Sequence, residues 1–407
     1  MLWQPSLPDE YTKASPESLR DRIASRRRQL GSDLVILGHH YQTDEVIQHA
    51  DFTGDSLKLS QLAAKKVAEQ NAKYVVFCGV HFMAETADML TPEHVAVILP
   101  DLSAGCSMAD MAAYDDAVAA WDEIHASLRS QGWKGRIIPI TYINSSAAIK
   151  AFVGSHGGAV CTSSNAATVF DWAMRGGTKP RAKGEDLKIL FLPDQHLGRN
   201  TAASFGIDVA TQTCVYDPRR SARGEALGGA TPEQVLASTA ILWAGHCSVH
   251  KLFRPEHCDR IIAANKGKRG KERTKILVHP ECCKEVVDRA DLAGSTEFII
   301  KTIREAEPGT HWAVGTEVHL VTRLAREAAE RGVHVRILSD CQCLCTTMYR
   351  IDQPHLCWAL DKLAEGKVVN RITVNAETKK LALEALDRML ALAPATPQAV
   401  AAHALVD

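Results

Sequence analysis

The sequence predicts an α/β fold in which one arrangement of strands and helices occurs three times. Each unit opens with a short apolar strand that runs directly into a polar cluster, and the three openings are 34–45, 136–147 and 275–286. A further apolar strand follows later in each unit, at 95–101, 187–194 and 311–317. Because strands that alternate with helices at this spacing imply parallel sheets wrapped by helices, we expect αβα units.

Helices are predicted between these strands from apolar residues that recur three and four positions apart. The first helical pattern in each unit covers 55–70, 146–154 and 283–291. Small polar residues then open a second helix in each unit, within 79–90, 161–174 and 294–306. One further helix is expected at 231–243.

The repeats divide the chain into segments. We predict a helical extension at 1–32, a first αβα domain at 33–118, a second at 119–230 and a third at 231–345. The segment 346–407 carries a helical pattern at 377–393 and is expected to return to the first domain. If the three units face one another around a pseudo-threefold axis, the loops at their strand ends meet in a central cavity.

The composition is that of an enzyme of the cytoplasm. The 407 residues are 46% hydrophobic, and 47 Lys and Arg residues balance 48 Asp and Glu residues, so neither nucleic acid nor a membrane is an expected partner. The basic stretch 266–275 is interpreted as a solvated loop. No apolar run is long enough to span a bilayer, and residues 1–13 do not resemble a signal peptide. Twelve cysteines without an export signal indicate a reducing compartment.

Three cysteine segments, far apart in the chain, together predict one metal centre. They are PDLSAGCSMAD with Cys106, LWAGHCSVHKLF with Cys247, and SDCQCLCTTMYR with Cys341, Cys343 and Cys345. None of them has the paired C-x-x-C knuckle of structural zinc sites, so one thiolate per segment indicates a [4Fe-4S] cluster with one open iron. The alternative is that the cysteines are small buried apolar residues, which we expect of Cys78, Cys161, Cys214, Cys258 and Cys357.

The polar clusters and the cysteine segments are expected at one edge of the sheets, where ligands bind beyond the carboxyl ends of parallel strands. Cys106 follows the strand 95–101, and Cys345 follows the apolar run that ends at Asp340. Cys247 is expected directly after the helix 231–243. This arrangement would allow one cluster to bind one thiolate from each of the three units.

The chain resembles the quinolinate synthases of the longer bacterial type. The matching motifs cover roughly residues 34–360 and are GHHYQ, GDSLKLSQLA, FCGVHFMAETA, LPDLSAGCSMAD, TYINSSAAIKA, CTSSNA, FLPDQHLGRN, GHCSVH, HPEC, GST, GTE and CLCTTMYRI. The resemblance implies three Rossmann-like αβα domains about a pseudo-threefold axis, with a [4Fe-4S] cluster in the central cavity. It also implies the condensation of iminoaspartate with dihydroxyacetone phosphate to quinolinate, phosphate and water, in NAD biosynthesis.

The resemblance also implies roles for individual residues. Glu281 corresponds to the acid/base carboxylate of the family, with His279 and His250 as donors to phosphate or carboxylate. His39, Tyr41, Tyr142 and Asn144 would line the substrate, and His279, Tyr41 and Tyr142 are also expected to take part in catalysis. The hydroxyl donors expected near helix starts are Ser56, Ser163, Ser295 and Thr296.

Several of these assignments have a structural alternative. Ser56, Ser295 and Thr296 can be simple helix N-caps, and Tyr41 and Tyr142 can be packing aromatics. We choose Cys345 as the third cluster ligand because C-T-T-M matches the family pattern of a ligand three residues before Met. The C-x-C-x-C spacing departs from the C-x-x-C-x-x-C form of this motif, which leaves the roles of Cys341, Cys343, Cys282 and Cys283 open.

Two other classes of function remain at this point. A non-catalytic iron–sulfur redox sensor would also have an exposed cluster, although the sequence shows no basic recognition helix or partner-binding module. A zinc-stabilised structural protein would need a fourth ligand and a closed site. For an enzyme, we expect small-molecule substrates and a transient contact with the enzyme that produces iminoaspartate.

Overall fold

The computed structural model describes residues 4–340, 343–392 and 399–402. It contains three five-stranded sheets, distributed over two compact units. Unit 1 comprises Met1–Ser107 and Leu344–Lys379, and unit 2 comprises Met108–Cys343 and Lys380–Asp407. None of the described helices is both long and apolar enough to cross a membrane.

Unit 1 contains one sheet with the strand order β14-β4-β3-β1-β2. Its strands are β1 (Leu34–His39), β2 (Phe52–Gly54), β3 (Tyr74–Cys78), β4 (Ala96–Ile98) and β14 (Arg371–Ile372). Its helices are α1 (Asp9–Thr12), α2 (Pro16–Leu30), α3 (Asp44–Ile47), α4 (Ser56–Gln70), α5 (His81–Leu90) and α16 (Gln353–Ala364). β1 is buried along its whole length, as a strand covered on both faces must be. Helices α2 and α16 pack against each other, so two segments far apart in the chain meet in this unit.

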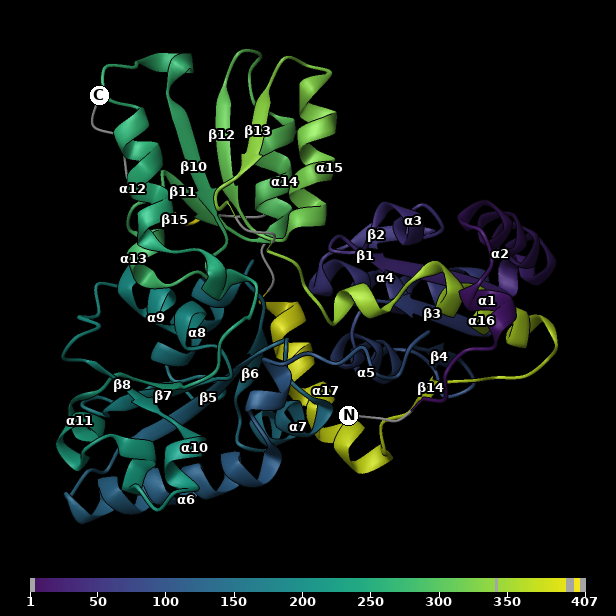
Figure 1. Ribbon diagram of the computed structural model, residues 1–407. Coiled ribbons are helices and arrows are strands. Elements are labelled where there is room, and N and C mark those ends of the chain that lie inside the picture. Colours follow the sequence, from purple (N-terminus) through teal and green to yellow (C-terminus); the bar gives the residue numbers. More distant parts are fainter. Residues whose placement is uncertain (1–3, 341–342, 393–398, 403–407) are drawn as a thin grey trace. The chain divides into compact units, whose positions relative to one another are not determined.

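The second sheet lies in unit 2 and has the order β6-β5-β7-β9-β8 (Figure 1). Its strands are β5 (Arg136–Tyr142), β6 (Ala159–Cys161), β7 (Leu187–Leu192), β8 (Thr213–Tyr216) and β9 (Ala240–Trp243). The helices in this part of the chain are α6 (Tyr114–Ser130), α7 (Ala147–Ser155), α8 (Ala166–Met174), α9 (Gln195–Ser204), α10 (Pro218–Ser221) and α11 (Pro232–Ala237).

The third sheet, also in unit 2, has the order β13-β12-β10-β11-β15. Its strands are β10 (Thr274–Val278), β11 (Leu292–Gly294), β12 (His311–Gly315), β13 (His334–Ile337) and β15 (Ala399–Ala402). The helices are α12 (Pro255–Ala264), α13 (Lys284–Val287), α14 (Thr296–Arg304) and α15 (Val318–Ala329), and Figure 1 shows α12 on one side of the sheet with α14 and α15 on the other.

The three sheets repeat one arrangement of their first three strands, which confirms the predicted α/β class with three repeated parallel units. In each sheet, the strand that opens the unit lies between the second and third strands, giving the local order 2-1-3; the fourth strand follows in the first and third sheets, whereas in the second sheet β9 lies between β7 and β8. Apart from the antiparallel pairs β14–β4 and β11–β15, the strand pairs of the described residues are parallel. In a doubly wound sheet with this order, the switch point lies between strands 1 and 3.

Two sequence-based helix assignments are wrong. The predicted helix 231–243 ends at Ala237, because Ser238 is extended and the apolar run Ala240–Trp243 forms the buried strand β9. Cys247 therefore follows a strand. The predicted helix 283–291 is limited to the single turn Lys284–Val287, since the chain must reach Leu292, where β11 begins beside β10.

The segment after residue 345 divides between the two units, although the sequence analysis placed all of it with the first domain. Helix α16 and strand β14 belong to unit 1, whereas α17 (Ala376–Ala391) continues into unit 2 from Lys380. Gly154 of α7 explains this packing, because a Cβ atom there would lie 1.9 Å from the carbonyl oxygen of Leu381. The backbone of α17 can approach α7 closely only at a glycine.

Candidate active site

A group of buried polar side chains lies at the switch point of the third sheet. His279 and Glu281 follow the end of β10, and Thr316 follows the end of its neighbour β12. His250 reaches the same place from the short helix η4 (His250–Leu252). Nδ1 of His250 lies 2.8 Å from Oε2 of Glu281, and Nε2 of the same ring lies 3.1 Å from the hydroxyl of Thr316.

His279 supports this arrangement from one side. Its ring stacks on that of His250, with centroids 4.4 Å apart and an angle of 13° between the planes. The backbone N–H of Glu281 donates to Nδ1 of His279 over 3.3 Å, which fixes the sharp turn after β10. The carboxylate of Glu281 therefore lies beside both rings, with Oε1 3.9 Å from Nδ1 of His279.

The electrostatics favour an ionised Glu281. Burial alone raises the pKa of this carboxyl group, but His279, His250 and a hydrogen bond from Tyr142 outweigh it and lower the pKa to about 2. Burial lowers the pKa of His279 to about 3, so this ring is neutral at pH 7. The site thus contains a carboxylate that is anionic at neutral pH, next to donors that stabilise its charge.

The second sheet contributes to the same site within unit 2. Tyr142, the last residue of β5, hydrogen-bonds to Glu281. From α9, the Nδ2 atom of Asn200 donates to the carbonyl oxygens of Pro280 and Cys282 over 2.8 and 2.9 Å. The turn that carries Glu281 is therefore held by the neighbouring sheet, and this holds the carboxylate in one position.

Asp194 is a second buried carboxyl group in this region. It caps α9, accepting hydrogen bonds from the backbone of His196 and Leu197, and it also interacts with the backbone N–H of Cys247. Burial and the nearby charge of Glu281 raise the pKa of Asp194 well above its ordinary value. Asp194 thus links the end of β7 to the loop that carries Cys247.

The loop of Cys247 begins directly after β9. Gly245 pairs with Asp194 across the strand ends, and a Cβ atom at Gly245 would lie 2.2 Å from the carbonyl oxygen of Pro193. Cys247 itself is partly exposed. Ligand atoms of Cys247, His250 and Glu281 all lie within 4.8 Å of one another, so these three residues can hold a metal ion.

Unit 1 holds the other predicted site residues in its own strand-end loops. His39 ends β1, its Nδ1 accepts the backbone N–H of Tyr41 over 3.1 Å, and the two rings meet edge to face at 4.7 Å. Arg350 donates to the hydroxyl of Ser103 over 3.1 Å, which joins the loop of Cys106 to that of Cys345. Both cysteines are partly exposed.

Three of the four predicted hydroxyl donors, Ser56, Ser295 and Thr296, lie at helix starts. Ser295 caps α14 by accepting from the backbone of Phe298, and Thr296 is the first residue of that helix. Ser56 is the first residue of α4, but the N-cap is Asp55. Ser163 is buried in the turn between β6 and α8, and Asn144 is partly exposed after β5.

The comparisons with known proteins show the family of the chain. Residues 21–391 match the family described as quinolinate synthetase A protein. The chain belongs to the quinolinate synthase family. The quinolinate synthase of Acidobacterium capsulatum is 52% identical over 94% of this chain and 95% of its own. The quinolinate synthase of Rhodopirellula baltica is 49% identical, over 94% of this chain and 93% of the relative. The quinolinate synthase of a Nocardioides species is 52% identical, over 95% of this chain and 92% of the relative.

Some site residues of this quinolinate synthase family member were missed by the sequence analysis. Thr316, Asp194 and Asn200 all contact or support the site, and all are at most 5% exposed. Thr316 and Asp194 lie just beyond the ends of β12 and β7, within the GTE and LPD motifs. Their position at a strand end was the signal that could have identified them.

Burial sorts the cysteines of the chain into two groups. Cys78, Cys161, Cys214, Cys258, Cys282, Cys343 and Cys357 are buried. Burial raises the pKa of Cys78, Cys258 and Cys357 to about 12, which keeps these thiols protonated. Cys106, Cys247, Cys283 and Cys345 are partly exposed, and Cys341 lies outside the described residues.

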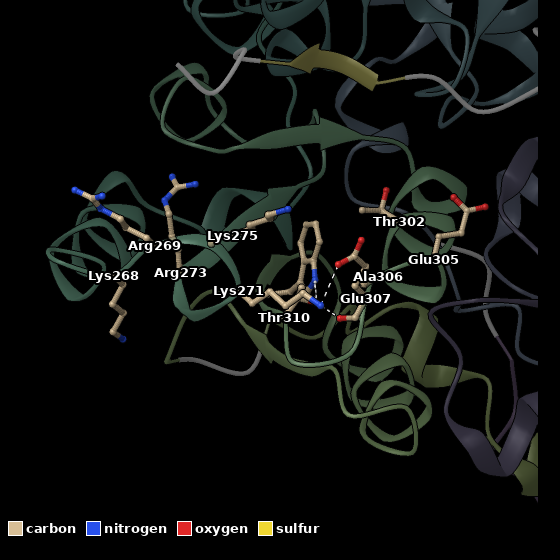
Figure 2. Close-up of a pocket in the computed structure, with 12 residues that line it drawn as sticks. Lys268, Arg269, Lys271, Arg273, Lys275, Thr302, Glu305, Ala306, Glu307 and Thr310 are labelled. Carbon is tan, nitrogen blue, oxygen red and sulfur yellow. Dashed lines mark hydrogen bonds and ion pairs between the residues drawn. The ribbon is translucent and has the colours of Figure 1, made fainter. Parts of the chain in front are cut away.

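A cavity of about 1220 Å³ lies at the opposite edge of the third sheet (Figure 2). The basic loop that precedes β10 lines it, together with Lys275 near the start of that strand. Lys271 pairs with Glu307 at 3.1 Å, and Arg273 pairs with Asp291 at 2.7 Å. Because Lys275 and His279 are at opposite ends of β10, this cavity is separate from the candidate active site.

Proposed function

We propose that this chain condenses iminoaspartate with dihydroxyacetone phosphate to quinolinate, phosphate and water, as a quinolinate synthase of NAD biosynthesis. Its family supports the reaction. The observation that carries the proposal is the buried group of Glu281, His250 and Thr316 beside Cys247. A buried ionised carboxylate next to a metal-binding thiol is suited to proton transfer at a metal-bound substrate.

A [4Fe-4S] cluster held by Cys106, Cys247 and Cys345 is part of the proposal. All three lie at partly exposed positions, whereas Cys343 is buried with its sulfur 3.1 Å from the hydroxyl of Ser339. This contrast supports Cys345 over Cys343. When bound, such a cluster with one open iron supplies a Lewis acid for a substrate oxygen.

Glu281 is the proposed acid/base residue. Ring formation from the two substrates requires proton removal and the loss of water, and an ionised carboxylate can accept a proton and return it later. His250 and Tyr142 hydrogen-bond to Glu281 and orient it. His279, neutral and stacked on His250, offers a further donor to the carboxylate or phosphate of a substrate.

Substrate binding is assigned to polar residues at strand and helix ends. Asn144, Ser163, Ser295 and Thr296 in unit 2, with His39, Tyr41 and Ser56 in unit 1, are donors of the kind that bind carboxylate and phosphate groups. The N-termini of α4 and α14 add backbone N–H groups and a favourable dipole for an anion. A transient contact with the enzyme that produces iminoaspartate completes the proposal.

The test is an anaerobic iron and sulfide count paired with an assay for quinolinate. We expect about four irons per chain, quinolinate formation from the two substrates, and loss of activity in air that iron and sulfide restore. Undiminished turnover after aerobic chelation would exclude a catalytic cluster. A cluster without quinolinate formation would favour the redox sensor, although a sensor gives no reason for the buried acid/base group.

A further inference from the structure

We propose that the cluster-free protein binds one Zn²⁺ ion through Cys247, His250 and Glu281, in a mononuclear site distinct from the three-cysteine centre. The ligand atoms of these residues lie within 4.8 Å of one another, and all three residues belong to unit 2. Thiolate, imidazole and carboxylate are the ligands that zinc prefers, and three protein ligands with one open position are typical of reactive zinc sites.

The distance between His250 and Glu281 requires little rearrangement. With the bond lengths that zinc forms to sulfur, nitrogen and oxygen, the donors of a tetrahedral site lie roughly 3.3–3.7 Å apart. Nδ1 of His250 and Oε2 of Glu281 are 2.8 Å apart, so they need to separate by only about half an ångström to admit the ion. Cys247, which is partly exposed, lies at the open side of the group and gives the ion a route of entry.

The surroundings of His250 also fit a zinc ligand. A metal-binding imidazole commonly donates its second N–H to an oxygen, which fixes the tautomer and the ring orientation. Nε2 of His250 lies 3.1 Å from the hydroxyl of Thr316, which leaves Nδ1 directed at Glu281 and the proposed ion. The stacked ring of His279 holds this orientation.

Zinc at this position would compete with the proposed cluster, because both need Cys247. On binding, the thiol of Cys247 releases its proton to solvent, the proton on Nδ1 of His250 is exchanged for one on Nε2 that is donated to Thr316, and zinc takes the place of the hydrogen bond between His250 and Glu281. Zinc bound first would therefore block the insertion of iron at Cys247. This consequence rests on the proposed cluster, whereas zinc binding itself does not.

The experiment titrates anaerobic, chelator-treated, cluster-free protein with Zn²⁺ and follows bound metal after desalting. Co²⁺ in place of Zn²⁺ reports a thiolate ligand through its charge-transfer absorption. We expect one ion per chain in the wild type and in Cys106→Ser, Cys345→Ser and Cys283→Ser. Cys247→Ser, His250→Gln and Glu281→Gln should each weaken binding by at least about 100-fold, and Thr316→Val by about 10- to 100-fold.

The variants separate this site from its alternatives. If Cys106→Ser or Cys345→Ser abolishes binding, the ion is held by the thiolates of the cluster site, and the proposal is wrong. Unchanged binding in Glu281→Gln and His250→Gln would also overturn it. Near-ultraviolet circular dichroism of each variant shows whether the fold is retained, and Glu281→Gln keeps the size of the side chain. No step measures quinolinate, so this result is independent of the proposed reaction.

Competition is measured separately. Protein loaded with one equivalent of Zn²⁺ should take up little iron during reconstitution with iron and sulfide, and removal of zinc by a chelator should restore uptake. Full iron uptake by zinc-loaded protein, with zinc still bound, would show that the two metals do not share Cys247.

Discussion

Nδ1 of His250 lies 2.8 Å from Oε2 of Glu281, and neither side chain is more than 3% exposed. The two residues are 31 positions apart in the chain and meet at the end of β10. A carboxylate with so little water around it depends on its protein partners for its charge. The position of Glu281 beside His250 at the end of β10 therefore determines the charge on which its expected chemistry depends.

Replacing Glu281 by Gln tests this chemistry. Gln keeps the size and much of the hydrogen bonding but cannot exchange a proton, so turnover should fall by roughly 10²- to 10⁴-fold while iron content stays at the wild-type level. Quinolinate formation and iron analysis of the same preparations measure both effects. Glu305→Gln, at an exposed position of unit 2, is the matched control. A near wild-type rate would remove Glu281 from the acid/base role.

Tyr142→Phe removes one hydrogen bond to Glu281 and leaves the ring in place. Because a hydrogen bond to a charged group contributes about 1.5–3 kcal/mol, we expect the rate to fall by about 10- to 100-fold with full iron content. Tyr114→Phe, at an exposed tyrosine of the same unit, should have the wild-type rate. Loss of iron in Tyr142→Phe would instead identify Tyr142 as a structural support of the cavity.

Cysteine replacement tests the proposed cluster. Single changes of Cys106, Cys247 or Cys345 to Ser should abolish a four-iron cluster and activity, because a site with three thiolates has no spare ligand. Changes at the buried Cys78 or Cys214 should preserve both. Iron content after anaerobic reconstitution is the measurement. A full cluster in Cys345→Ser, with loss only in Cys341→Ser or Cys343→Ser, would reassign the third ligand.

Much of this site could be predicted from the sequence because the ends of the apolar strands can be recognised in it. The strands β1, β5 and β10 are apolar runs that end in His39, Tyr142 and Val278, and the polar residues after them lie where ligands bind in parallel sheets. Shorter strands such as β2, β3, β6 and β11 were missed, since runs of three to five residues show no clear period. Partners such as Thr316 depend on which strands are neighbours, and only the folded chain shows this.

Protonation of His49 should destabilise unit 1 in mild acid. Burial, with help from Arg27 and Arg20, lowers the pKa of His49 to about 4, and Nε2 of the ring lies 3.3 Å from the amide nitrogen of Gln353. Between pH 6.5 and 4, the unfolded chain binds a proton that the folded chain does not, so stability falls as the pH falls. The loss between pH 7 and 5 is on the order of 1–2 kcal/mol.

Urea unfolding at pH 7 and pH 5 measures this difference. The variant His49→Gln should lose less stability between the two pH values than the wild type, whereas His94→Gln, at an exposed position, should behave like the wild type. Equal losses in all three proteins would show that His49 does not cause the acid sensitivity.

Gly154→Ala should destabilise the packing of α17 on α7. In an exposed helix this change would stabilise by about 1 kcal/mol, because alanine has the higher helix propensity. Here the new Cβ atom would lie 1.9 Å from the carbonyl oxygen of Leu381, and backbone cannot move aside as a flexible side chain can. The contacts that hold α17, such as the 2.6 Å hydrogen bond from Arg388 to the carbonyl oxygen of Gly158, would be strained.

We expect the free energy of unfolding to fall by about 1–3 kcal/mol in Gly154→Ala and to change little in Ser155→Ala, at the next and exposed position of α7. A stability equal to or above that of the wild type in Gly154→Ala would contradict the close approach of the two helices.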